Sequence, residues 1–321
     1  MRPDLPLLAL LATNLLVFGK DTASRLSLGK LHDELVQASF ELLIDGRLEG
    51  TGFLVDKDGH AATVWHAAGR EGKLEIRSRA LGRLDVVRVG HDRSHDLTLL
   101  KLPCRNEPYP FLPIGKQGVG PGQPIYLLGT PIFRHRVFIT GHVARRGTTF
   151  EYFNGNFVEG IHVTAITPGG CSGGPWVNRQ GQVVGMQAAS MTLKAVHQGI
   201  ATMIPAKSIR EILEKKADIL APSLDMAVEE LWGQEVKYIS KVPKGKKGLV
   251  VRQLKKEGTA AKAGVKEWDF VTNVDGRNID ETNTFIRHLR RKKLGDHLKM
   301  EVMNRDGSDK RQVRIKLVPL R

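Results

Sequence analysis

Short apolar runs separated by turn residues recur along most of the chain. Residues 51–55 form one such run, which a turn follows at 56–59, and residues 95–102 alternate between apolar and polar positions after an opening carboxylate. Helical spacing of apolar residues is confined to a few stretches, among them residues 30–38, 205–216 and 281–293. The pattern therefore predicts a mostly β protein with few helices.

The length and the change of composition after residue 216 predict two domains. A chain of 321 residues can bury a sizeable core in each of two domains. Pro222, Gly233 and Pro243 interrupt the pattern between them. We therefore expect a signal peptide or short anchor at 1–19, an N-terminal segment at 20–47, a first domain at 48–216, a linker at 217–243 and a second domain at 244–321.

The first 19 residues have the features of a secretory signal. Arg2 precedes an apolar stretch from Leu5 to Phe18, and Gly19 ends a candidate cleavage site. The stretch is shorter than the roughly 20 residues that span a bilayer, and Asp4 and Asn14 weaken it as a permanent anchor. A cleaved signal is favoured over a retained anchor, and both place the rest of the chain outside the cytoplasm, in the periplasm or secreted.

Positive charge is concentrated near the C-terminus. The chain carries a net charge of +15, and residues 241–321 contain 22 Lys and Arg against 10 Asp and Glu. A solvated basic face, a preference for acidic peptide tails, and attachment to an anionic envelope surface are the alternatives. A nucleic-acid partner is disfavoured, because the region lacks the interleaved aromatic residues of a single-strand binder.

The strongest chemical signal is the segment from Pro168 to Trp176, which contains Gly-Cys-Ser-Gly-Gly-Pro. Its glycines permit positive φ angles, and the amides of Gly170 and Ser172 can converge on the oxygen of an attacked carbonyl. His66 and Asp96 lie upstream, and a serine nucleophile needs a base and a group that orients the base. The order His, Asp, Ser matches that of the chymotrypsin fold.

On these residues the chain resembles the HtrA (DegP-like) family of serine proteases, from about residue 48 to 319. Other supporting segments are residues 50–53, 121–131, 137–143 and 199–205. The resemblance implies a chymotrypsin/trypsin-like double β-barrel, with His66 as base, Asp96 orienting it, Ser172 as nucleophile and the Gly170 and Ser172 amides as oxyanion hole. It also suggests a homotrimer. Cys171 and Thr164 stand where the family usually has Asn and Asp, and the loss of Asp at 164 predicts a change in how the activation loops are held.

From Gly248 onward the chain resembles a PDZ domain, an α+β fold that binds peptide C-termini as an added strand. The resemblance assigns the carboxylate-binding loop and its strand to residues 248–251, and the facing helix to residues 281–293. The expected peptide-binding residues are Gly248, Leu249, Val250, Val251, Phe285 and Leu289.

Substrate preference is expected to follow from Ile166, six residues before the nucleophile, which would lie at the base of the substrate pocket. An apolar base favours cleavage after small or apolar residues. The expected pocket walls are Gln187, Ala188, Ala189 and Ser190. No metal or other cofactor is expected, because the spacing of His91, Asp92 and His95 fits no standard metal site. Cys104 and Cys171 are the two cysteines; free thiols are favoured over a bond between them.

These features predict an extracytoplasmic serine endopeptidase that cleaves unfolded or damaged proteins by acyl transfer, with a PDZ domain that recruits or senses peptide C-termini. Two alternatives stay open: a peptide-binding chaperone or scaffold, and a membrane-tethered, site-specific signalling protease. The resemblance to the family also implies that the loops at 146–159, 168–171 and 187–197 are mobile until a peptide or oligomerisation orders them, which would leave Ser172 weakly reactive at rest.

Overall fold

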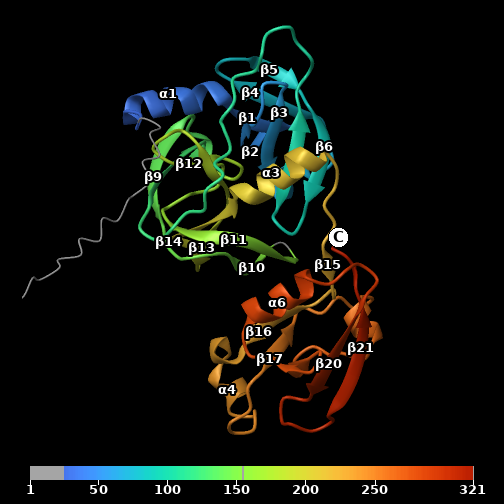
Figure 1. Ribbon diagram of the computed structural model, residues 1–321. Coiled ribbons are helices and arrows are strands. Elements are labelled where there is room, and N and C mark those ends of the chain that lie inside the picture. Colours follow the sequence, from blue (N-terminus) through green and yellow to red (C-terminus); the bar gives the residue numbers. More distant parts are fainter. Residues whose placement is uncertain (1–24, 154, 321) are drawn as a thin grey trace, which may run out of the picture.

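The computed structural model describes residues 25–153 and 155–320, and it shows two bodies (Figure 1). The larger, N-terminal body contains two seven-stranded sheets, and the smaller body contains a further sheet with helix α6 (Thr282–Arg290) against it. The chain passes between the bodies after α3 (Ala206–Lys215). The predicted signal peptide at 1–19 lies outside the described residues, and no helix among the described residues is long and apolar enough to cross a membrane.

The first sheet has the strand order β5-β4-β1-β2-β3-β7-β6. Its strands are β1 (Ser39–Ile44), β2 (Arg47–Leu54), β3 (His60–Val64), β4 (Leu74–Ser78), β5 (Gly82–Asp85), β6 (Val87–Asp92) and β7 (Leu97–Lys101), with the short helix α2 (Trp65–Ala68) after β3. Helix α1 (Leu28–Ala38) precedes the sheet; the Ser27 hydroxyl accepts a hydrogen bond from the Lys30 amide, which caps the helix. Leu31 and Leu35 of α1 are fully buried, which fixes the helix against the barrels.

The second sheet has the order β10-β11-β14-β13-β12-β8-β9, and β11 also pairs with β9, which closes it. Its strands are β8 (Pro124–Gly129), β9 (Val137–Val143), β10 (Thr149–Phe153), β11 (Asn156–Thr164), β12 (Pro175–Val177), β13 (Val183–Leu193) and β14 (Val196–Pro205), with the 3-10 turn η1 (Pro131–Phe133) after β8. One apolar core joins the two sheets and includes Phe53 and Leu100 of the first, Met186 and Ile204 of the second, and Ile209 of α3. The predicted double-barrel fold is confirmed.

The C-terminal body contains a sheet of order β16-β17-β18-β20-β21, with β19 paired to β18, and a two-stranded β15-β22 ribbon. The strands are β15 (Pro222–Ser223), β16 (Ala227–Glu230), β17 (Leu249–Arg252), β18 (Phe270–Val274), β19 (Arg277–Asn278), β20 (His297–Met303), β21 (Arg311–Lys316) and β22 (Val318–Pro319). The remaining elements besides α6 are η2 (Leu231–Gly233), α4 (Val236–Ile239) and α5 (Thr259–Lys262). Phe270 and Phe285 are both buried, which indicates that this body has a core of its own.

The bodies begin earlier in the chain than the sequence analysis places them. Residues 217–243 were expected to be a linker, but β15 pairs with β22, and β16 pairs with β17. Val228 of β16 is buried in the C-terminal core, so this stretch is part of that body from about residue 222. Likewise β1, expected within the N-terminal segment, is an inner strand of the first sheet. Flanking Pro and Gly residues concealed these short strands, which are defined by pairing with distant strands.

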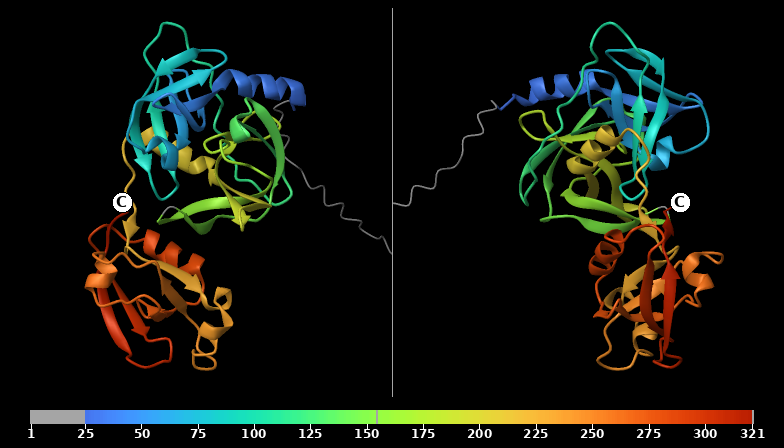
Figure 2. Two further views of the ribbon diagram at one scale, coloured as in Figure 1. Left: turned by 180° about the vertical axis from the view of Figure 1, so that it is seen from behind. Right: turned by 45° about the vertical axis from the view of Figure 1, so that its right-hand side comes forward.

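The β10–β11 hairpin of the N-terminal body lies against α6 of the C-terminal body (Figures 1 and 2). The Asn283 side-chain oxygen accepts a hydrogen bond from the Phe150 amide at 2.9 Å. Arg290 donates to the carbonyl oxygen of Phe157, also at 2.9 Å. Phe150 and Phe157 belong to the apolar cluster of the C-terminal body, so the hairpin extends that core instead of lying loosely on its surface.

Candidate active site

His66 and Asp96 form an oriented pair on the first barrel. His66 lies in α2, directly after β3, and Asp96 lies in the turn that leads into β7, the strand that pairs with β3. The His66 ring nitrogen Nδ1 is 2.6 Å from one Asp96 oxygen, and the His66 amide donates to the other at 2.8 Å. Asp96 is buried at 3% exposure. Two contacts to one carboxylate fix the ring and leave Nε2 for a proton from the nucleophile.

Ser172 is carried on the second barrel, in the turn before β12. The Thr51 amide of β2 donates to the Ser172 carbonyl oxygen at 2.8 Å, which ties the turn to the first barrel. Gly173 follows with a φ of 86°, and a Cβ there would lie 1.9 Å from the Thr51 carbonyl oxygen. Glycine is therefore required at this position, and the Thr51 contact brings the candidate nucleophile Ser172 to the barrel that carries His66 and Asp96.

The side chain of Ser172, the candidate nucleophile, is hydrogen-bonded away from His66, the candidate base. The Ser172 hydroxyl donates to the Ala188 carbonyl oxygen at 3.2 Å and makes no hydrogen bond with His66. Asp96 holds the His66 ring in place, and a hydrogen bond between Ser172 and His66 would require the Ser172 side chain to leave the Ala188 carbonyl oxygen. Catalytic hydrogen bonds in proteins without substrate are often loose in this way.

The backbone around the nucleophile leaves two amides available for an oxyanion. The Gly169 carbonyl oxygen accepts from the Ile132 amide at 2.8 Å. Because N–H and C=O point in opposite directions across a trans peptide, the Gly170 N–H faces away from Ile132. The Thr51 hydroxyl holds the Gly170 carbonyl oxygen at 2.8 Å. Neither the Gly170 nor the Ser172 amide has a partner among the described residues, as an oxyanion hole requires.

Phe153, at the end of β10, contacts the ring of His66, the candidate base, a contact that the sequence did not predict. Its ring meets the His66 ring edge-on, with 5.3 Å between centroids. The β10–β11 hairpin thus contacts His66 through Phe153 and α6 through Phe150 and Phe157. The signal in the sequence was a group of three aromatic residues, Phe150, Tyr152 and Phe153, in a loop that was expected to be mobile.

A charged cluster connects the turn that carries Asp96 to the hairpin. His95 lies 2.7 Å from buried Asp92 and 3.6 Å from Glu159 of β11. Burial alone would lower the pKa of His95, but the carboxylates of Asp92 and Glu159 raise that pKa to about 9. Burial works in the opposite direction on Glu159, yet His95 and Thr148 bring its pKa down to about 2.

Arg290 of α6 completes this cluster from the other body. Burial lowers the pKa of Arg290 to about 10, while Asp92 and Glu159 favour its charged form. At neutral pH the cluster thus contains two carboxylates and two cations. It links the element beside Asp96, the hairpin and the C-terminal body.

Cys171 contributes to the loop only through its backbone and its bulk. Its side chain is fully buried, and burial raises the pKa of the thiol to about 12. Both cysteines are free; Cys104 is exposed. A protonated, buried thiol is not a competing nucleophile.

The expected pocket residues are only partly brought together. Ile166 is 59% exposed. The Ala188 carbonyl oxygen holds the Ser172 hydroxyl, and the Ser190 hydroxyl donates to the Thr167 carbonyl oxygen at 2.6 Å, next to Ile166. Ala189 pairs with Thr202 across the β13–β14 ladder.

Gln187 does not line the pocket. Its side chain is 1% exposed, and it accepts from the Trp176 indole N–H and donates to the Ala189 carbonyl oxygen, both at 2.9 Å. A buried indole N–H needs an acceptor, and Gln187 supplies it inside the barrel.

The predicted peptide-binding strand of the PDZ domain is wrong. Leu249, Val250 and Val251 lie in β17, which pairs with β16 on one side and with β18 on the other. A strand paired on both sides has no free backbone groups for a peptide. Phe285 and Leu289 are also buried, in the core. The edge strand beside α6 is β16, so an added peptide strand would pair with residues 227–230.

The β10–β11 hairpin already occupies the space beside the N-terminal end of β16. Residues before β16, residues of α6 and the hairpin residues Tyr152, Asn156 and Phe157 together enclose a space of only about 20 Å³. Three basic side chains in and just after α6 are also engaged: Arg287 and Arg290 donate to the carbonyl oxygens of Thr148 and Phe157, and Lys292 pairs with Asp275 at 2.6 Å. These three side chains are therefore not part of a free basic face beside the groove.

The histidines considered as metal ligands each have a carboxylate partner of their own. His91 pairs with Asp218 at 2.8 Å, and His95 pairs with Asp92. No group of three His, Cys, Asp or Glu side chains suited to a metal ion occurs within residues 25–153 and 155–320.

Comparison with protein families places the two bodies. Residues 50–186 match the trypsin-like peptidase domain, and residues 231–317 match the PDZ domain. A probable periplasmic serine endoprotease, DegP-like, of Brucella suis is 24% identical over 275 residues, which are 84% of this chain and 53% of that protein. Protease Do-like 1, chloroplastic, of Arabidopsis thaliana is 24% identical, over 84% of this chain and 64% of its own length. The chain thus spans about half to two thirds of these relatives.

Solved structures agree with the fold. The HtrA-type protease AlgW with a decapeptide superposes with a TM-score of 0.66 at 18% identity, covering 92% of this chain and 99% of that one. The serine endoprotease from Yersinia pestis superposes with a TM-score of 0.62 at 18% identity, covering 93% and 100%. The predicted resemblance to HtrA and DegP-like proteases is confirmed.

Proposed function

Because this HtrA-like chain joins a trypsin-like peptidase domain to one PDZ domain, we propose that it is an extracytoplasmic serine endopeptidase that cleaves unfolded or damaged proteins. The observation that carries the proposal is the His66–Asp96 pair beside Ser172, whose flanking amides are free to bind an oxyanion. The periplasmic and chloroplastic names of relatives support a location outside the cytoplasm.

Catalysis begins when the Ser172 side chain turns from the Ala188 carbonyl toward His66. His66 Nε2 then takes the hydroxyl proton, and the serine oxygen attacks the substrate carbonyl carbon. The Gly170 and Ser172 amides stabilise the negative oxygen of the tetrahedral intermediate. His66 returns the proton to the leaving amine, and a water molecule hydrolyses the acyl-enzyme by the same steps.

The PDZ domain would sense peptide C-termini through β16 and α6. A peptide that pairs with β16 would meet the β10–β11 hairpin, which occupies the space beside the N-terminal end of this strand. Binding would therefore shift the hairpin, whose Phe153 lies on His66. This links an occupied PDZ domain to an uncovered base.

Cleavage of unfolded casein tests the proposal, with the Ser172→Ala variant beside the wild type and with or without hydrophobic C-terminal peptides. We expect cleavage by the wild type alone, stimulated by peptide. The Asn283→Ala variant removes the side chain that holds the Phe150 amide, and it should raise basal cleavage and reduce the stimulation. Intact casein under every condition, with no adduct of an organophosphonate on Ser172, would refute the peptidase.

A membrane-tethered signalling protease is the second candidate. AlgW, which superposes on most of this chain, was solved with a decapeptide, as expected of a protease that responds to a specific peptide. Casein left intact while Ser172 accepts the phosphonate would favour this candidate. A chaperone role would show as suppressed client aggregation by the Ser172→Ala variant. The homotrimer and the attachment to an anionic envelope surface stay predictions. Analytical sedimentation tests the first by measuring the mass of the oligomer, and binding to anionic vesicles tests the second.

A further inference from the structure

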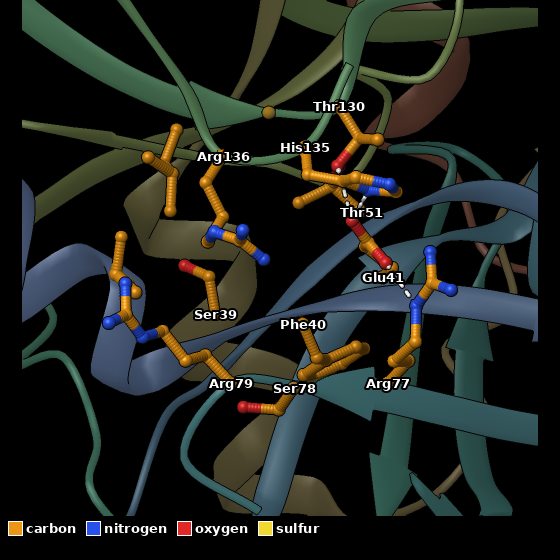
Figure 3. A pocket seen from close by; sticks show the side chains of 13 residues that line it. Ser39, Phe40, Glu41, Thr51, Arg77, Ser78, Arg79, Thr130, His135 and Arg136 are labelled. Atoms are coloured by element: carbon orange, nitrogen blue, oxygen red, sulfur yellow. Dashed lines mark hydrogen bonds and ion pairs between the residues drawn. The ribbon is translucent and has the colours of Figure 1, made fainter. Parts of the chain in front are cut away.

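A cavity of about 370 Å³ lies where the two barrels meet (Figure 3). It is next to residues 168–172, the loop that carries the candidate oxyanion hole and is called the oxyanion loop below. Its walls come from the start of β1, the end of β4 with Arg79, the end of β8, and the segment with His135 and Arg136; Val36 of α1 contributes one side. Its volume lies within the range of small-molecule sites. Nothing in the proposed peptidase mechanism uses it.

The cavity carries an excess of positive charge. Its one carboxylate, Glu41, is buried and already neutralised: Arg77 Nε donates to it at 2.6 Å, and His135 Nδ1 pairs with it. Arg79 and Arg136 also line the cavity, and neither has an ion pair or hydrogen bond with any described residue. Figure 3 shows these two guanidinium groups on one side and Glu41 with its partners on the other.

A buried hydroxyl between these groups also lacks a partner. Ser39 is 6% exposed, and its Oγ makes no hydrogen bond. A buried polar group without a partner is uncommon in a folded protein. Figure 3 places this hydroxyl on the side of Arg79 and Arg136, so an anionic oxygen bound there would accept from all three.

Part of the wall is apolar. Val36, Phe40 and Leu128 line the cavity, and each is at least nine-tenths buried. An inorganic anion would leave this surface without a partner. A carboxylate joined to a short apolar group fits both halves of the site.

The cavity shares residues with the loop that forms the oxyanion hole. Thr51 lines it and holds the Gly170 carbonyl oxygen through its hydroxyl. Thr130 and Arg136 bracket the segment that contains Ile132, whose amide holds the Gly169 carbonyl oxygen.

That segment has an unusual backbone. Ile132, Phe133 and Arg136 all have positive φ, between 48° and 61°. Such angles are costly for residues other than glycine and persist only where the surroundings impose them. A ligand that binds Arg79 of the first barrel and Arg136 of this segment would hold the segment in place.

We propose that this cavity binds a small organic acid, a carboxylate with a short apolar group such as the C-terminal residue of a peptide, and that its binding favours the reactive form of the oxyanion loop. The acid group pairs with Arg79, Arg136 and the Ser39 hydroxyl. The apolar group packs on Val36, Phe40 and Leu128. The site is separate from the PDZ edge strand β16.

Titration calorimetry on the full-length Ser172→Ala protein tests binding without any need for catalysis. The probes are N-acetyl-leucine and N-acetyl-leucinamide, which differ only in the charged carboxylate. We expect the acid to bind at least about tenfold more tightly than the amide, since a charge-assisted hydrogen bond contributes about 1.4 kcal/mol or more. The Arg79→Gln/Arg136→Gln double variant should lose about the same factor. Equal binding of acid and amide, or full binding by the double variant, would overturn the site.

Two controls sharpen the result. Arg47→Gln removes an exposed arginine of the same barrel outside the cavity and should leave affinity unchanged. Inorganic phosphate should bind more weakly than N-acetyl-leucine; equal or tighter binding would contradict the apolar half of the site. N-acetyl-leucine should raise the rate of phosphonate labelling of Ser172 severalfold in the wild type. It should leave this rate unchanged in the Arg79→Gln/Arg136→Gln double variant. Binding with an unchanged labelling rate would overturn the coupling to the loop.

Discussion

Replacing His95 by Gln should remove a pH-dependent contribution to stability. His95 is the group in the Asp92–His95–Glu159 cluster that titrates above neutral pH, with its pKa raised from 6.5 to about 9 against the opposing effect of burial. A group whose pKa is higher in the folded protein stabilises it fully below the unfolded value. This contribution is therefore complete below pH 6.5 and is lost as the pH rises through 9.

The size of the effect follows from the two pKa values. Each unit of difference corresponds to about 1.4 kcal/mol, so the interaction contributes about 3 kcal/mol when His95 is charged. The His95 side chain is 16% exposed, and solvent screening reduces the expected value to about 2 kcal/mol. Asp92 and Glu159 stay ionised across this range, because their own pKa values are lowered.

Urea unfolding at pH 6 and pH 9.5, at one ionic strength, measures the effect. The Ser172→Ala background prevents self-cleavage, and fully buried Trp176 reports on the peptidase domain. Between pH 6 and pH 9.5, the unfolding free energy of the parent should fall by about 2 kcal/mol more than that of His95→Gln. His142→Gln, at an exposed position of β9, should follow the parent. Parallel pH dependence of the parent and His95→Gln would refute the charge assignment.

Three further outcomes are expected. Phe153→Ala should raise the rate of phosphonate labelling of Ser172 severalfold, since it uncovers His66; an unchanged rate would mean that the ring is no barrier. Gly173→Ala should lower the free energy of unfolding, measured with urea, by at least about 2 kcal/mol, because its Cβ would lie 1.9 Å from the Thr51 carbonyl oxygen. Gly169→Ala, with open space around the new Cβ, should not do so. Iodoacetamide at pH 8 should add to Cys104 alone in the native protein and to both cysteines after unfolding, because burial raises the pKa of Cys171 to about 12; two adducts on native protein would contradict this.

The outcome at the PDZ domain shows where sequence reasoning failed. The Gly-Leu-Val-Val segment at 248–251 has the apolar, β-branched residues typical of a strand, but residue type says nothing about which neighbours pair with the strand. The structure places β17 between β16 and β18, and this excludes it from peptide binding. The strand at the edge, β16, was concealed in a stretch read as a linker. The prediction for Gln187 was also wrong: it was expected in the wall of the substrate pocket, but its side chain is buried and accepts a hydrogen bond from the Trp176 indole.

The sequence by itself determined the β-rich class and the two domain types, because those depend on residue type and local spacing. It also singled out His66, Asp96 and Ser172 as the candidate catalytic residues from their type and their order along the chain. Only the tertiary structure decided that Ser172 turns toward Ala188, that Phe153 covers His66, and that the β10–β11 hairpin lies on α6. The bond between Phe150 and Asn283 joins residues 133 positions apart. Contacts of this kind depend on how whole elements pack, and no local pattern of residues encodes them.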